Sequence, residues 1–180
     1  MPNNVVATIT PHHLLLTIDA AVSSGLHFCK PVAKYPDDRS ALRSVIAEGH
    51  PRFFLGSDSA PHPASAKLPS LLVTRNAEDN TEEVALSSPC AAGIYTSAEL
   101  MPLLAHTFEK ASIPLSRLEG FASTFGRDFY RIPAHPEKSI TLKRSSTKRI
   151  ASSYPYDGER GPDRVIPFLS GEMIGWEISV

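Results

Sequence analysis

Short apolar runs and spaced apolar stripes along this chain predict alternating strands and helices. Val5 to Thr10 is a β-branched run, which predicts a strand close to the first residue. Residues 53–55 form an unbroken apolar run, which is typical of a strand covered on both faces. Residues 36–49 carry an apolar stripe that predicts a helix, with Asp37 or Asp38 able to cap its start. A strand, a helix and a strand in this order predict a βαβ unit with parallel strands and a right-handed crossover.

The pattern is less regular after each of these elements. Residues 14–35 show no sustained period, which predicts a long loop. Residues 63–88 are rich in Pro, Ser and acidic residues, and we expect a surface excursion with no packed core. A further helix is expected to begin at Thr96 or Ser97 and to bury one apolar face.

The C-terminal part of the chain predicts one more helix and several outer pieces. The helix is expected over residues 114–125, with Gly126 closing it. Residues 145–162 form a polar segment. The apolar stretches at 165–169 and 176–180 resemble edge strands that pack on the outside of a larger structure.

Composition and charge are those of a soluble globular domain. The chain has 180 residues, of which 42% are hydrophobic and 21% charged, and its formal net charge is -1. The basic pairs at 143–144 and 148–149 lie in a Ser-rich stretch and predict a solvated loop, so no nucleic-acid partner is expected. No apolar run approaches the roughly 20 residues that cross a bilayer, and the start lacks a secretory signal. We expect a cytoplasmic protein without a membrane partner.

The cysteines and histidines give no metal-ligand spacing by themselves. Cys29 and Cys90 are too few and too far apart for a disulfide framework or a zinc knuckle. His12 and His13 are adjacent, and on a strand they would point to opposite faces, which favours a structural role for both.

A polar cluster follows the strand predicted at residues 53–55. It contains Asp58 and His62, four residues apart, at the point where a buried strand should emerge. In barrels of alternating strands and helices the chemistry lies at the carboxyl ends of the strands, so this cluster is a candidate active-site edge. The same residue types are also ordinary in turns and helix caps. A serine hydrolase using Ser57 or Ser59 is disfavoured, because neither lies in a G-x-S-x-G turn.

Four segments carry a family resemblance. They are residues 7–14 (ATITPHHL), 54–62 (FLGSDSAPH), 90–95 (CAAGIY) and 165–172 (VIPFLSGE). Taken together and in order, they resemble the C-terminal portion of dihydroorotase, of the shorter, single-activity type in the metal-dependent amidohydrolase superfamily. The resemblance covers nearly the whole chain apart from the 63–88 excursion and part of the tail.

The resemblance implies an α/β fold, a TIM-type (β/α)8 barrel of which this chain holds about the last two strand-helix units. Residues 1–135 would be the C-terminal part of the barrel, and residues 136–180 an extension packing on the barrel exterior. The implied activity is the reversible conversion of N-carbamoyl-L-aspartate to L-dihydroorotate in pyrimidine biosynthesis. The intact enzyme would be a zinc hydrolase with two zinc ions, acting on a small-molecule substrate and capable of forming a homodimer.

The resemblance also implies roles for individual residues. Asp58 matches the carboxylate at the end of the last barrel strand, which ligates one zinc and carries the proton of the bridging hydroxide. His62 matches a residue that helps to hold the free carboxylate of the substrate. Lys30 and Ala92 fall where the family uses backbone groups to fix the pyrimidine ring, so their side chains should matter little.

Most of the family's zinc ligands have no counterpart in this sequence. The His-x-His pair, the carboxylated lysine, the two single histidines and the substrate-binding Arg and Asn are missing. The histidines at 27, 50, 106 and 135 are scattered and predict surface or packing roles. A catalytic zinc has about three protein ligands, so we expect the chain alone neither to bind zinc tightly nor to hydrolyse dihydroorotate. The chain would then be a shortened gene product or one part of a split enzyme. The alternative is a non-catalytic interaction module that uses the Asp58 and His62 pocket, or its exposed edges, to bind a partner.

Overall fold

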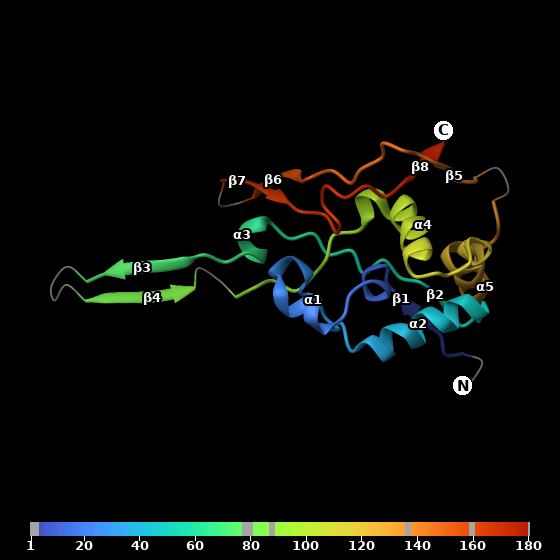
Figure 1. Ribbon diagram of the computed structural model, residues 1–180, viewed down its shortest axis with the longest axis horizontal. Helices are drawn as coiled ribbons and strands as arrows, with labels where there is room; N and C mark the ends of the chain where they lie inside the picture. Colours follow the sequence, from blue (N-terminus) through green and yellow to red (C-terminus); the bar gives the residue numbers. More distant parts are fainter. Residues whose placement is uncertain (1–3, 77–80, 87–88, 136–137, 159–160, 180) are drawn as a thin grey trace.

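The computed structural model describes residues 4–76, 81–86, 89–135, 138–158 and 161–179. Within these residues the chain forms two-stranded sheets with short helices between them (Figure 1). The strands are β1 Ala7–Ile9, β2 Phe53–Leu55, β3 Leu71–Arg75, β4 Glu82–Leu86, β5 Thr141–Arg144, β6 Tyr154–Gly158, β7 Gly161–Val165 and β8 Trp176–Ser179. The helices are α1 Ile18–Ser23, α2 Pro36–Glu48, α3 Ala64–Lys67, α4 Leu100–Lys110 and α5 Phe125–Tyr130. Single-turn helices are η1 His12–Leu14, η2 Gly25–His27, η3 Ser97–Glu99 and η4 Leu115–Arg117, and η5 Gly120–Thr124 is a π-helical turn.

The predicted βαβ unit is confirmed. Strands β1 and β2 pair in parallel with α2 between them in sequence, and Ala7 lies opposite Phe53. Gly49 ends α2 in the left-handed conformation, with a φ of 76°. Of the two predicted capping residues, Asp38 is the one that caps the helix. Tyr35 precedes the helix, and its backbone N–H donates to the side chain of Asp38 at 3.1 Å, so Asp38 caps from inside the first turn.

The prediction of a loop over residues 14–35 was wrong, because the segment contains α1 and η2. Helix α1 has six residues, too few to establish a helical period in the sequence. Its Ala21 is buried in a core with Leu16 and Cys29. Packing against the rest of the chain therefore holds a helix that local pattern does not show.

The 63–88 excursion lies at the surface as predicted, but it has regular structure. Strands β3 and β4 form an antiparallel hairpin that extends away from the body of the molecule (Figure 1). Every residue of β3 is exposed, including Leu71 at 67%. Helix α3 is different, because its last residue, Lys67, is buried. The start of the excursion thus belongs to the packed body, and residues 77–80 and 87–88 lie outside the described residues.

Two helices cover the parallel strand pair and the core beside it. Helix α4 is buried from Pro102 to Phe108. The helix predicted to end at Gly126 instead continues through η5 and α5, and Arg131, with a φ of 55°, follows its last residue. A Cβ at position 126 would lie 3.3 Å from the ring of Phe54 on β2. Gly126 therefore permits close packing of the helix on the strand rather than closing the helix.

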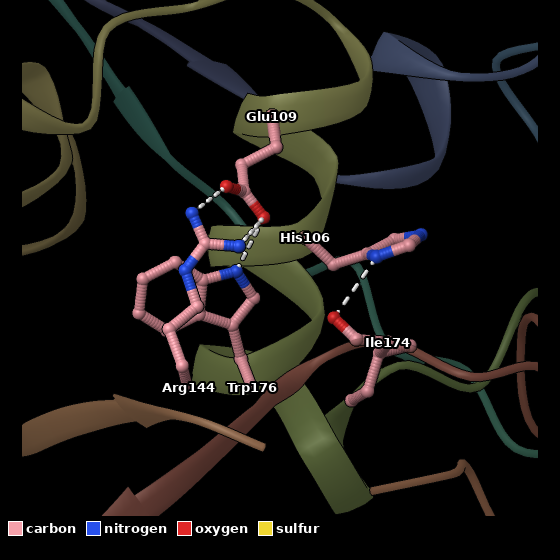
Figure 2. A network of polar contacts seen from close by, with 5 residues as sticks. All are labelled: His106, Glu109, Arg144, Ile174 and Trp176. Carbon is pink, nitrogen blue, oxygen red and sulfur yellow. Dashed lines mark hydrogen bonds and ion pairs between the residues drawn. The ribbon is translucent and has the colours of Figure 1, made fainter. Parts of the chain in front are cut away.

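The C-terminal segment packs on α4. Strands β5 and β8 pair antiparallel, and Trp176 donates from its indole nitrogen to Glu109 of α4 at 2.6 Å (Figure 2). Arg144 forms an ion pair with Glu109 and lies over the Trp176 ring, 4.4 Å from the centroid. Residues 143–144 are thus part of β5, not of a solvated loop. On the other side of α4, His106 Nδ1 lies 3.0 Å from the carbonyl oxygen of Ile174.

Residues from both ends of the chain share one hydrophobic cluster. Leu16 and Leu103 pack there with Ile150, Phe168 and Ile174, all at 7% exposure or less. The predicted boundary after residue 135 falls at residues 136–137, outside the described part, and the division of the chain there stays a prediction. Within the described residues no helix is long and apolar enough to span a membrane.

Candidate functional site

Asp58 lies three residues beyond β2, at the carboxyl end of the parallel strand pair. Its carboxylate is exposed and lines a pocket of about 450 Å³. The backbone of Asp58 has a φ of 42°, in the left-handed region that Asp and Asn tolerate better than most residues. Strained backbone of this kind is enriched at functional sites. Lys30 and Lys34 line the same pocket, so one acidic and two basic residues border it.

His62 and Ala92 are brought into direct contact. His62 Nε2 lies 3.1 Å from the carbonyl oxygen of Ala92, and since a carbonyl only accepts, Nε2 carries the proton. A Cβ at the neighbouring Gly93, where φ is 155°, would lie 2.8 Å from the His62 ring and 2.7 Å from Ala60. The small residues at 90–93 therefore allow the close backbone approach that the sequence indicated.

The loop that carries Lys30 is tied to the loop that carries Ala92. Gly93 N–H donates to the carbonyl oxygen of Phe28 at 2.9 Å, two residues before Lys30. The four residues assigned by resemblance thus fall into two pairs, and their roles stay a prediction. Asp58 and Lys30 meet at the pocket, while His62 and Ala92 meet through the hydrogen bond.

Lys67 is a site residue that the sequence gave no reason to choose. Its ammonium group donates to the carbonyl oxygens of Phe28, Ala91 and Gly93 at 2.7, 2.9 and 2.7 Å. Burial lowers the pKa of Lys67. The sequence predicted a surface excursion here, where a buried lysine is not expected. The hydrogen-bond partners of Lys67 lie more than 20 residues away in the sequence, so the local sequence pattern does not predict its burial.

The serine hydroxyls near Asp58 have structural partners. Ser59 Oγ accepts from the backbone N–H groups of Thr96 and Ser97, at 3.0 Å each, and so caps the start of η3. Thr96 donates from its hydroxyl to the carbonyl oxygen of Ser57 at 3.3 Å. These contacts give Ser59 a role in joining the segment after β2 to the start of η3, in place of a nucleophile's role.

Potential metal ligands gather at a second place, close to the pocket. His12, His13 and Cys29 offer ligand atoms that all lie within 4.8 Å of one another. His12 and His13 lie on the single turn η1 and not on a strand, so the expectation that they point to opposite faces was wrong. Asp58 is in no group of three or more such ligands among the described residues. The residues present around Asp58 therefore do not fit a zinc pair by themselves.

Comparison with known proteins identifies relatives of this chain. The chain is 43% identical over 203 residues to a dihydroorotase of Mycosarcoma maydis, covering 98% of this chain and 51% of that protein. It is 36% identical to a dihydroorotase of Saccharomyces cerevisiae, covering 97% and 43%. The chain is thus a homologue of dihydroorotases over about half of their length. No family model matches it.

Solved dihydroorotases have the same fold over this region. The Saccharomyces cerevisiae enzyme, crystallised with 5-fluoroorotic acid, matches with a TM-score of 0.71 at 34% identity, covering 97% of this chain and 43% of that one. The Campylobacter jejuni enzyme matches with a TM-score of 0.71 at 27% identity, covering 99% and 46%. The chain thus spans about half the length of the dihydroorotases that it matches.

Proposed function

We propose that this chain supplies one part of a dihydroorotase active site, for the reversible conversion of N-carbamoyl-L-aspartate to L-dihydroorotate. The observation that carries the proposal is Asp58, placed at the carboxyl end of parallel β2 inside a pocket shared with Lys30 and Lys34. Both substrates are anionic, and a basic residue, Lys34, lines the same pocket and would favour an anion there. The family relationship adds the reaction class.

In the proposed complete enzyme, β1 and β2 are the last two strands of an eight-stranded barrel. Parallel strands in such barrels are covered on both faces and paired on both edges. In the described residues β1 pairs with β2 alone, which leaves one edge of each strand for a further barrel strand. The βαβ order and the likeness to two solved dihydroorotases support this assignment.

Asp58 is the group we assign to metal and proton chemistry. In the intact enzyme its carboxylate would join ligands from the remaining part of the barrel around two zinc ions, which supply a nucleophilic hydroxide near neutral pH. A carboxylate at that position could accept and return a proton during the reaction. This chain provides one such ligand, so we expect no turnover from the chain alone.

His62, Lys30 and Ala92 are assigned to substrate binding. Because His62 Nε2–H donates to Ala92 O, its other nitrogen, Nδ1, is the one left for the free carboxylate of the substrate. Donation from Nδ1 requires the protonated ring. Backbone groups of Lys30 and Ala92 would fix the pyrimidine ring, with the Phe28 to Gly93 hydrogen bond setting the spacing of the two loops.

We place the intact enzyme in the cytoplasm, as a protein able to form a homodimer. The two free cysteines fit that compartment.

A complementation assay tests the proposal. The purified chain is assayed for dihydroorotate formation alone, and then mixed or co-expressed with the part of a relative's sequence that this chain does not match. We expect no activity from either part and zinc-dependent activity from the two together. Turnover by this chain alone would contradict the proposed dependence on missing ligands, and an inactive but stable complex of the two parts would favour a non-catalytic module.

A further inference from the structure

Three potential metal ligands converge beside the pocket that Asp58 lines. The ligand atoms of His12, His13 and Cys29 all lie within 4.8 Å of one another. Imidazole nitrogen and thiolate sulfur are the donors that Zn²⁺ and similar thiophilic ions prefer. His13 lines the pocket, whereas His12 and Cys29 are 0% and 1% exposed. The pocket therefore gives an ion a path to a group of ligands that is otherwise buried.

His12 is the observation that points to a ligand at this place. Both of its ring nitrogens are buried and have no hydrogen-bond partner. Buried polar atoms nearly always have a partner, because an unsatisfied one costs about 1–3 kcal/mol. A neutral imidazole binds a metal through one of its ring nitrogens.

His13 and Cys29 have the chemistry to complete the group. Cys29 Sγ lies 3.9 Å from His13 Nε2, and Thr10 Oγ1 lies 2.6 Å from His13 Nδ1. A metal at Nε2 would replace the 2.8 Å contact of that atom with the carbonyl oxygen of Pro31. Nδ1–H would then donate to Thr10, the outer contact that orients most metal-binding histidines.

We propose that His12, His13 and Cys29 form a binding site for one thiophilic divalent cation, separate from the site that Asp58 serves. The thiol of Cys29 would release its proton to solvent as its bond to the metal forms. Two imidazoles and one thiolate give three protein ligands, and a water completes the tetrahedral set. This proposal departs from our sequence-based expectation that the chain alone does not bind zinc tightly, because the fold brings Cys29 next to His13, 16 residues away in the sequence.

Cobalt titration of the purified chain tests the site without any enzyme assay. Co²⁺ bound to a thiolate gives a near-ultraviolet charge-transfer absorption. We expect it to saturate at one equivalent in the wild type, in Asp58→Asn and in Cys90→Ser, which removes the other cysteine. It should be lost in Cys29→Ser, and His12→Gln should weaken Co²⁺ binding by more than about tenfold. Thr10→Val, which keeps all three ligands, should also weaken binding, by roughly tenfold.

The controls keep the result independent of folding and of the proposed dihydroorotase function. Far-ultraviolet circular dichroism identifies any variant that has lost its fold, and Thr10→Val then stands in for His12→Gln. No absorption in the wild type, or equal absorption in Cys29→Ser, would overturn the proposal. Loss of the absorption in Cys90→Ser would also overturn it, because Cys90 would then be the ligand. A failed complementation assay would leave the cobalt result unchanged.

Discussion

The ammonium nitrogen of Lys67 lies 2.7 Å from the carbonyl oxygen of Gly93, inside the packed body of the chain. The same group donates to carbonyl oxygens of Phe28 and Ala91. Lys67 is 5% exposed, so all three bonds are sheltered from water. One buried cation thus joins the two loops that carry Lys30 and Ala92, and it sets their spacing at the proposed substrate site.

Replacing Lys67 tests this connection. Lys67→Met removes three hydrogen bonds from a charged donor and leaves buried carbonyls unpaired, and we expect the free energy of unfolding to fall by roughly 3 kcal/mol. Urea denaturation followed by circular dichroism measures it. Lys110→Met, at an exposed position on α4, is the matched control and should change stability by less than about 0.5 kcal/mol. Equal stability of the two variants would contradict the role of Lys67.

The buried ring of His12 predicts a pH dependence of stability. Its folded pKa is lowered from 6.5 to about 3, so between these values the unfolded chain binds a proton that the folded chain does not. The free energy of unfolding therefore falls as the pH falls through this window, by up to about 1.4 kcal/mol per unit from this group. With a chelator present, the wild type should lose more stability than His12→Gln between about pH 7 and pH 5. His135→Gln, at an exposed position, should follow the wild type. Parallel curves for the wild type and His12→Gln would contradict the prediction.

Trp176 reports on the docking of the C-terminal segment. It is the one tryptophan in the sequence and is 8% exposed, so its fluorescence should be blue-shifted in the folded chain. Glu109→Ala removes the acceptor of its indole N–H and the partner of Arg144, and we expect a red shift and a loss of roughly 1–3 kcal/mol. Glu177→Gln breaks the exposed pair with Lys143 and should leave both the emission spectrum and the stability close to those of the wild type. An unchanged emission spectrum in Glu109→Ala would show that the β5 and β8 pair docks without this contact.

The hydroxyl of Ser59 predicts a measurable capping effect. Ser59→Ala leaves the N–H groups of Thr96 and Ser97 without their acceptor, and we expect a loss of about 1 kcal/mol in the free energy of unfolding. Ser44→Ala, at an exposed position in α2, should be neutral or slightly stabilising because Ala favours helix. A stabilising Ser59→Ala would show that the hydroxyl does not act as a cap.

The parts of the fold that the sequence predicted are those fixed by local pattern. Apolar spacing, with the glycine after the helix, predicted β1, β2 and α2. The polar residues after β2 predicted that Asp58 lies at the carboxyl end of that strand. The contacts of Lys67, and the meeting of Cys29 with His13, join residues 16 or more positions apart and leave no periodic signal. Gly126 shows the same limit: its role depends on Phe54, which the sequence places far away. Tertiary packing, rather than propensity, decided each of these cases.

The most direct test of the account is the activity of Asp58→Asn in the complemented enzyme, compared with Asp157→Asn, an exposed position on β6. The account predicts that the Asp157 variant forms dihydroorotate at the wild-type rate, and that the Asp58 variant loses at least about a hundredfold in rate. The Asp58 variant should still associate with the other part of the enzyme, because its carboxylate is exposed in the pocket. Wild-type turnover by Asp58→Asn would contradict the claim that this carboxylate is the catalytic group that the chain contributes.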